Sequence, residues 1–258
     1  MTAARWSLEG RRAVVTGATK GIGAAVADEL LTLGASVLLV ARTEADVTGA
    51  IATRRERHGA ARVHGMAADV TTEKGRGALL AAAEESLGGL DILVNNVGTN
   101  IRKPSIDYGP DEVEHLFRTN LTSAWEMSRA AHPLLKKSDA GSIVNIGSVA
   151  GQVSVHSGAP YAMTKAALDQ LTRYLAVEWA PDGIRVNAVA PWYTRTPLAS
   201  VVLDRPEFAE GVLARTPLGR IAEPDDISGL VAFLCLPCAR HITGQVVAVD
   251  GGFLAFGF

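Results

Sequence analysis

Short apolar runs alternate with longer stretches of helical length along the whole chain. The runs are continuously apolar, which is typical of strands covered on both faces of a sheet. Seven of them are expected to be strands: Ala13–Thr16, Val37–Val40, Val63–Ala67, Ile92–Asn95, Ser142–Ile146, Val186–Ala190 and Val246–Val249. The helical segments between them include Ala24–Leu33, Asp111–Lys136, Tyr161–Trp179 and Asp225–Leu236. This order predicts a single α/β domain over residues 1–258, a doubly wound parallel sheet of about seven strands with helices on both faces.

One long stretch, Pro191 to Pro224, lacks a regular pattern and carries several prolines. It follows the sixth predicted strand. Because ligands bind beyond the carboxyl ends of the strands in a sheet of this kind, we expect residues 191–224 to cover the site as a lid.

The composition excludes several classes of protein. Of the 258 residues, 48% are hydrophobic and 20% are charged, and the formal net charge of −2 with scattered Lys and Arg argues against a nucleic-acid binder. Met1–Arg12 lacks the apolar core of a secretory signal, and the apolar run Leu230–Leu236 is too short to span a bilayer. We therefore expect a cytoplasmic protein with no membrane partner and no metal site.

The two cysteines, Cys235 and Cys238, form a C-x-x-C pair. A redox pair is expected at the start of a helix, where the helix dipole lowers the thiol pKa. This pair instead lies where a helix is expected to end, at Pro237. Reduced, structural thiols are therefore the favoured interpretation.

A glycine-rich loop joins the first predicted strand to the first helix. Its spacing is G-x-x-x-G-x-G, and its candidate binding residues are Gly17, Thr19, Lys20, Gly21, Ile22 and Gly23. Glycines allow a tight turn and let the backbone approach a pyrophosphate at the helix amino terminus. The loop therefore predicts a dinucleotide site.

The end of the second predicted strand bears on the choice of cofactor. A carboxylate there would bind the ribose 2′-hydroxyl of NAD, but Ala41 and Arg42 follow the strand and the first acid is Glu44. Arg42 can grip a 2′-phosphate, and Lys20 can add a second positive charge. Both cations can equally be solvated surface residues. The pattern favours NADP(H).

Three polar residues carry the candidate chemistry: Ser148, Tyr161 and Lys165. Tyr161 and Lys165 are four residues apart on a predicted helix and so share one face. An ammonium beside a phenol favours the phenolate and brings its pKa down from about 10. Ser148 can donate a hydrogen bond to a carbonyl oxygen as negative charge develops there. This set predicts hydride transfer between a nicotinamide and the carbonyl or alcohol carbon of a small molecule.

Over nearly its full length the chain resembles the short-chain dehydrogenase/reductases, which have a Rossmann fold. The resemblance rests on the glycine loop, on Asp69-Val70 and Asn95-Asn96-Val97-Gly98, and on Asn120, Ser148, Tyr161 and Lys165, which match the family's catalytic tetrad. Residues 98–104 and 191–198 resemble the tropinone-reductase-like branch. The chain departs from the broad family pattern at Val97 and Trp192, where alanine and glycine are usual.

The resemblance implies further roles for these positions. Asp69 would contact adenine, Asn95 would support the sheet or the ribose, and Asn120 would hold a water beside Lys165. Lys165 would also bind the nicotinamide ribose, and Thr196 the carboxamide. The remaining cofactor-binding candidates are Val70, Asn96, Gly98, Tyr161, Pro191 and Thr194.

The predicted substrate pocket is mostly apolar. Besides Ser148 and Tyr161, its candidates are Ile101, Val149, Val155, His156, Trp192, Tyr193 and Leu198. Such walls suit a small hydrophobic ketone or alcohol. The loop from Val149 to Pro160 offers no carboxylate to a protonated amine, and the first acid after the fourth strand is Asp107. The branch resemblance therefore does not assign a substrate.

Two other functions remain open. One is a 3-oxoacyl-carrier-protein reductase, for which Arg129, Lys136, Lys137 and Arg173 are candidate docking cations. The other is a non-catalytic NADP-binding sensor, which the intact Ser148, Tyr161 and Lys165 set disfavours. We also expect a homo-oligomer, a tetramer or a dimer, because the two long predicted helices are apolar around much of their surface.

Overall fold

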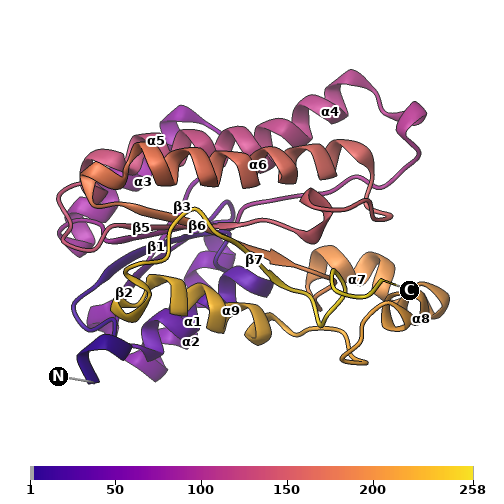
Figure 1. The fold of residues 1–258 in the computed structure, drawn as a ribbon. Helices are drawn as coiled ribbons and strands as arrows, with labels where there is room; N and C mark the ends of the chain where they lie inside the picture. Colours follow the sequence, from indigo (N-terminus) through magenta and orange to yellow (C-terminus); the bar gives the residue numbers. More distant parts are fainter. Residues whose placement is uncertain (1–2, 258) are drawn as a thin grey trace.

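The computed structural model describes residues 3–257 and contains one seven-stranded parallel sheet (Figure 1). The strand order is β3-β2-β1-β4-β5-β6-β7, which extends by one strand the order typical of dinucleotide-binding folds. The strands are β1 Arg12–Thr16, β2 Ser36–Ala41, β3 Val63–Ala67, β4 Ile92–Asn95, β5 Ser142–Ile146, β6 Arg185–Pro191 and β7 Val246–Val249. All seven predicted strands are confirmed within a residue or so at each end.

Helices cover both faces of the sheet, as predicted. One face carries α1 Gly21–Thr32, α2 Glu44–His58 and α9 Pro224–Cys235; the other carries α3 Glu73–Leu87, α4 Pro110–Phe117, α5 Ser123–Leu135 and α6 Ala159–Glu178 (Figure 1). Two buried apolar clusters fill the two interfaces. The continuous apolar strands are explained by this arrangement, since each strand side chain meets a helix layer above or below.

The predicted helix Asp111–Lys136 is interrupted. The helices α4 and α5 are joined by a π-helical turn, Arg118–Thr122. A π-turn inserts one extra residue into the helical repeat and is frequent at functional sites. Asn120 lies within this turn and is almost fully buried.

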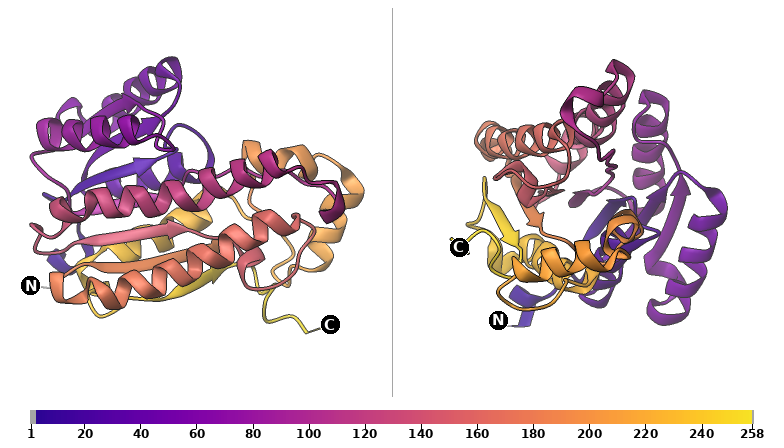
Figure 2. Two further views of the ribbon diagram at one scale, coloured as in Figure 1. Left: turned by 90° about the horizontal axis from the view of Figure 1, so that it is seen from above. Right: turned by 90° about the vertical axis from the view of Figure 1, so that its right-hand side faces the viewer.

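The stretch 191–224, predicted to be irregular, contains two short helices, α7 Pro197–Leu203 and α8 Pro206–Ala214. Pro197 and Pro206 each lie in the first turn of a helix, where the missing amide hydrogen leaves no bond unmade. The two helices enclose a small apolar cluster of their own. In Figure 2 (left) they lie beyond the carboxyl ends of the strands, where a lid was expected.

The cysteine pair lies at the end of α9, as predicted. Both cysteines are free thiols, and burial raises the pKa of the Cys235 thiol to about 12. A thiol with so high a pKa is a poor nucleophile, which agrees with a structural role. None of the described helices is long and apolar enough to cross a membrane.

Candidate active site

A cleft of about 630 Å³ runs along the carboxyl ends of the strands, within the usual size range for ligand sites. It brings together most of the residues singled out from the sequence. Those from the cofactor and catalytic sets are Gly17, Thr19, Lys20, Gly21, Ile22, Arg42, Asp69, Val70, Asn96, Gly98, Ser148, Tyr161, Lys165, Pro191, Thr194 and Thr196. Gly23, Asn120, Ile101 and His156, which were also predicted, do not line it.

The glycine loop has the geometry that a pyrophosphate site requires. Gly17 and Gly21 have φ angles of +64° and +56°, which side-chain-bearing residues rarely adopt. A Cβ atom on Gly23 would lie 2.2 Å from the Gly17 carbonyl oxygen, so Gly23 serves the packing of the loop. Asn96 Nδ2 donates to the carbonyl oxygens of Thr16 and Gly17 at 3.0 and 3.1 Å. The loop is thus held open in front of the first amides of α1.

Asp69 follows β3 and lines the cleft. Its Oδ1 accepts hydrogen bonds from the Thr71 amide at 2.9 Å and the Thr71 hydroxyl at 2.7 Å. Burial acts to raise the pKa of this carboxyl, but the bonds from Thr71 and the charges of Arg42 and Arg118 bring it below its usual value. Asp69 is therefore an ionised acceptor with its second oxygen outside these bonds.

The two cations predicted to bind a 2′-phosphate are not equivalent. Lys20 Nζ lies 3.0 Å from Asp46 Oδ2, so its charge already has a partner. Arg42 makes no ion pair within residues 3–257. Both side chains line the cleft together with Asp46. Arg42 is thus the stronger candidate for an incoming dianion.

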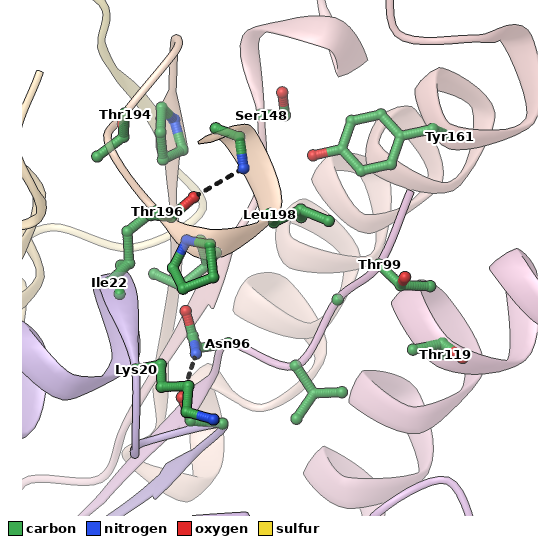
Figure 3. A pocket seen from close by; sticks show the side chains of 18 of the residues that line it. Lys20, Ile22, Asn96, Thr99, Thr119, Ser148, Tyr161, Thr194, Thr196 and Leu198 are labelled. Carbon is green, nitrogen blue, oxygen red and sulfur yellow. Dashed lines mark hydrogen bonds between the residues drawn. The ribbon is translucent and has the colours of Figure 1, made fainter. Parts of the chain in front are cut away.

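The start of the segment 191–224 packs over the glycine loop. A Cβ atom on Gly21 would lie 3.1 Å from Thr196 Cγ2, a tight contact, and the φ angle of +56° favours glycine there as well. Thr196 Oγ1 in turn accepts a hydrogen bond from the Ala199 amide at 3.2 Å and caps α7. Figure 3 shows Thr196 beside Ile22 and across the cleft from Tyr161. The cofactor end and the catalytic end are thus bridged by one loop.

Ser148 and Tyr161 face each other at the far end of the cleft (Figure 3). Ser148 follows β5, and Tyr161 lies in the first turn of α6. Burial raises the pKa of the Tyr161 phenol, while the nearby Ser148 hydroxyl and the charge of Arg102 oppose the rise. We expected from the sequence that Lys165 would depress this pKa; the net direction is the opposite, because burial dominates. Tyr161 therefore holds its proton at neutral pH.

Lys165 lies beneath the Tyr161 ring, with Nζ 5.7 Å from the ring centroid. It is only 4% exposed, and its Nζ donates to the Ile146 carbonyl oxygen at 2.7 Å. Burial lowers the pKa of this ammonium to about 8, although the charge of Asp169 opposes the shift. The predicted proximity of Tyr161 and Lys165 is confirmed, but the ammonium lies under the ring.

Asn120 lies behind the cleft and holds its wall. Asn120 Oδ1 accepts from the Thr99 amide at 2.8 Å, and Nδ2 donates to the Thr99 carbonyl at 2.9 Å and to Thr164 Oγ1 at 3.2 Å. A Cβ atom on Gly98 would lie 3.5 Å from Asn120 Oδ1 and 3.7 Å from Lys165 Nζ. Asn120 and Lys165 thus both lie close to Gly98.

Asn95 lies away from the cleft, in the interior of the sheet. Its Nδ2 donates to Ser128 Oγ at 3.0 Å and to Asn145 Oδ1 at 2.9 Å. Of the two roles implied for Asn95, support of the sheet is the one that this geometry allows.

The substrate end of the cleft has aromatic and apolar walls. Val155, Trp192, Tyr193 and Leu198 line it, as predicted. Trp192 stacks on Phe253 with ring centroids 3.8 Å apart and its Nε1 donates to Thr216 Oγ1 at 3.1 Å. Trp192, which stands where the family usually has glycine, is therefore held in place by Phe253 of the carboxyl-terminal segment.

Three substrate candidates do not line the cleft. The Ile101 side chain does not line the cleft, although its carbonyl oxygen accepts a hydrogen bond from the Tyr108 hydroxyl. His156 is exposed and outside the cleft, and Val149 is buried behind it. Arg102, which was not predicted as a site residue, does line the cleft, as do Thr99, His115, Arg118 and Thr119. In the sequence, the only feature that indicates a site role for Arg102 is its position in the loop that follows β4.

The described part of the chain holds no group of three or more His, Cys, Asp or Glu side chains that could bind a metal ion.

Comparison with known proteins identifies the family. The family model described as "Enoyl-(Acyl carrier protein) reductase" matches residues 17–254. A tropinone reductase homolog from Arabidopsis thaliana is 50% identical over 255 residues, which cover 98% of this chain and 96% of that protein. This similarity confirms the narrower resemblance to the tropinone-reductase-like branch.

Two solved structures share the fold over nearly the whole chain. A gluconate 5-dehydrogenase from Burkholderia cenocepacia, in complex with NADP and tartrate, is 33% identical with a TM-score of 0.93, covering 99% of this chain and 100% of that one. A short-chain type dehydrogenase/reductase from Mycobacterium marinum is 30% identical with a TM-score of 0.92, covering 98% and 99%. The chain therefore belongs to the short-chain dehydrogenase/reductase family of oxidoreductases.

Proposed function

We propose that the protein is an NADP(H)-dependent oxidoreductase that acts on the carbonyl or alcohol carbon of a small ketone or alcohol. The observation that carries the proposal is the convergence of Ser148, Tyr161 and Lys165 at one end of a cleft whose other end is the glycine loop. A nicotinamide bound in such a cleft supplies or accepts the hydride.

The cleft fits an NADP(H) molecule by its own groups. The positive-φ glycines leave the amides at the start of α1 open to a pyrophosphate, and Asp69 offers an ionised oxygen to the nucleoside. Arg42 lies at the rim without an ion pair among the described residues, which supports a 2′-phosphate there.

Each catalytic side chain has one task in this proposal. Tyr161 keeps its proton at neutral pH because burial raises its pKa, and it donates that proton to the substrate oxygen during reduction. Ser148 donates a hydrogen bond to the same oxygen as negative charge develops. Lys165 provides a positive charge under the phenol ring and stabilises the phenolate that remains.

The alternative of a carrier-protein substrate lacks support at the expected docking cations. Arg129 lies 2.6 Å from Glu126, Lys136 lies 2.7 Å from Asp182, and Lys137 lies 3.9 Å from Glu84. These three charges are matched by neighbouring carboxylates. Arg173 is the one expected docking cation without an ion pair among the described residues, and a single charge does not make a strong positive field. A non-catalytic sensor is disfavoured because it needs no phenol beside a buried ammonium. A cytoplasmic location stays a prediction from the sequence.

Tyr161→Phe tests the proposal. It removes one hydroxyl, keeps the ring, and should leave NADPH affinity nearly unchanged while turnover on a good ketone falls by about 10²–10⁴-fold. Steady-state rates over a panel of ketones, with NADPH titrations of both proteins, provide the measurement. If the variant kept more than about a tenth of wild-type turnover, the acid would be another group and the assignment of Tyr161 would be wrong.

A further inference from the structure

The substrate end of the cleft contains one charged group that the proposed reaction does not use, the guanidinium of Arg102. Arg102 belongs to the loop after β4 and lines the cleft with Ser148, Tyr161 and Tyr193. Its Nε is buried and has no hydrogen-bond acceptor among the described residues. Arg102 as a whole is half-buried, and a buried donor such as its Nε costs free energy when it has no acceptor.

The neighbouring side chains do not balance the positive charge of Arg102. Lys103, the next residue, is paired with Glu112 and does not line the cleft. The carboxylates that do line it, Asp46 and Asp69, belong to the cofactor end: Asp46 is bound to Lys20, and Asp69 follows β3. Within residues 3–257, no ion pair involves Arg102.

The guanidinium is close enough to the reacting end to affect both phenols there. The positive charge of Arg102 opposes the rise that burial causes in the pKa values of Tyr161 and Tyr193. Both phenols are neutral and leave the positive charge uncompensated. A substrate whose carbonyl oxygen lies between Ser148 and Tyr161 would therefore place its adjacent atoms within the field of Arg102.

We propose that Arg102 binds a carboxylate of the substrate, so that the protein reduces keto acids to hydroxy acids or carries out the reverse oxidation. The inference rests on the proposed function and names its substrate class. In the reduction, the hydride of the reduced nicotinamide adds to the ketone carbon, the C=O π bond breaks, and the Tyr161 proton completes the hydroxyl. The carboxylate takes no part in the electron flow.

A carboxylate fits this cleft better than a phosphate. A planar guanidinium can donate two parallel hydrogen bonds to a carboxylate, and one positive charge balances one negative charge. The remaining walls at this end are apolar or aromatic, from Val155, Trp192 and Leu198. Apart from the two cations at the cofactor end, two further cations line the cleft, but Lys165 lies under the Tyr161 ring and Arg118 is paired with Glu114, so neither is left to bind a dianion. The apolar walls suit a short carbon chain. Arg102 therefore makes the pocket selective for an anion. The apolar walls alone would not give that selectivity.

The test compares matched substrates with matched variants. A panel of straight-chain keto acids of three to six carbons is measured against the corresponding keto amides, with NADPH, for wild type, Arg102→Gln and Lys103→Gln. The ratio of kcat/KM for acid over amide cancels any general loss of activity. We expect a wild-type ratio of about ten to a hundred, since a charge-assisted pair is lost with the amide. The ratio should fall to near one in Arg102→Gln and stay unchanged in Lys103→Gln.

A binding measurement separates this inference from the proposed reaction. Calorimetric titration with pentanoate, a monoanion with no ketone to reduce, should detect binding to the NADPH-loaded wild type and at least tenfold weaker binding to Arg102→Gln. Pentanamide should bind both proteins equally weakly.

The outcomes are distinct. Equal acid-to-amide ratios in wild type and Arg102→Gln, in a protein whose ketone reduction still requires Tyr161, would overturn the role of Arg102 and leave the proposed function standing. A stronger response to a phosphorylated ketone than to every keto acid would also overturn it. If no ketone were reduced, the proposed function would fail, and the pentanoate titration would still decide whether Arg102 binds a carboxylate.

Discussion

Lys165 and Asp169 lie one helical turn apart on α6, and both charged groups are buried. Neither oxygen of the Asp169 carboxylate has a hydrogen-bond partner among the described residues. Burial raises the pKa of Asp169 to about 6, against the charges of Arg173 and Lys165, and burial lowers the pKa of Lys165 to about 8. Each group thus keeps the other closer to its charged form, and Asp169 is a positioning residue for the charge beneath Tyr161.

The first prediction concerns the pH dependence of reduction. Removing the carboxylate in Asp169→Asn should lower the pKa of Lys165 below about 8, because the charge that opposes its desolvation is lost. The alkaline limb of kcat/KM should move to lower pH, with a several-fold loss of activity at pH 8. A pH profile from 6 to 10 measures it. Asp182→Asn, at a surface carboxylate paired with Lys136, is the control and should leave the limb in place.

A second prediction concerns stability. The folded-state pKa of Asp169 lies above its ordinary value, so between about pH 4 and 6 the folded protein keeps a proton that the unfolded chain releases. Stability from this group therefore falls as pH rises through that window, and the full penalty is present above about pH 6. Asp169→Asn should be more stable than wild type at pH 7, by on the order of 1–3 kcal/mol, and the gain should shrink toward pH 4. Urea unfolding at both pH values measures it; a gain that did not depend on pH would contradict the assignment.

The third prediction concerns cofactor choice. NADPH should bind much more tightly than NADH, and Arg42→Ala should weaken NADPH binding by tens of times to about a hundredfold, with little effect on NADH. Lys20→Ala should cost less, because Lys20 already pairs with Asp46. Asp46→Asn should strengthen NADPH binding by removing a like charge from the phosphate end. Fluorescence titration of both cofactors provides the measurement, and equal wild-type affinities would refute the NADP preference.

Much of the fold was predictable because parallel strands with two covered faces are continuously apolar, as in Ile92–Asn95 and Ser142–Ile146. The π-turn at Arg118–Thr122 was not, because the helical pattern continues on both sides of a single extra residue. The lid helices were missed because Pro197 and Pro206 resemble helix breakers when the start of the helix is unknown. Proline alone does not distinguish the first turn of a helix from a loop.

The candidate site also contains residues that could be predicted from the sequence and residues that could not. The sequence predicts the positions of residues that follow a strand or share a helix face. Ser148, after β5, and Tyr161 and Lys165, on α6, all line the cleft as expected. A loop has no period that reveals which of two neighbouring side chains turns inward, and so Ile101 was chosen where Arg102 lines the cleft. The net pKa of Tyr161 also escaped prediction, because it depends on how completely the surrounding chain excludes water.

The last prediction concerns assembly. On α6, Met163, Ala167, Gln170, Tyr174 and Val177 recur every three or four residues and so share one face. Met163, Tyr174 and Val177 are 54%, 62% and 79% exposed, and Trp125 of α5 is 36% exposed. A shallow groove lined by residues of both helices runs beside them, between Trp125 and Tyr174. An apolar surface of this kind favours contact with a second copy of the chain.

We therefore expect a homo-oligomer, a tetramer or a dimer, formed through α5 and α6. In a two-fold contact a charge placed on this face approaches its own copy, so Val177→Glu should shift the protein toward lower mass at micromolar concentration. Val201→Glu, at an exposed valine of α7, is the matched control and should leave the mass unchanged. Light scattering measures each mass. A wild-type mass of 27.0 kDa, that of one chain, would rule out the oligomer, and an unchanged oligomer in Val177→Glu would place the contact on another face.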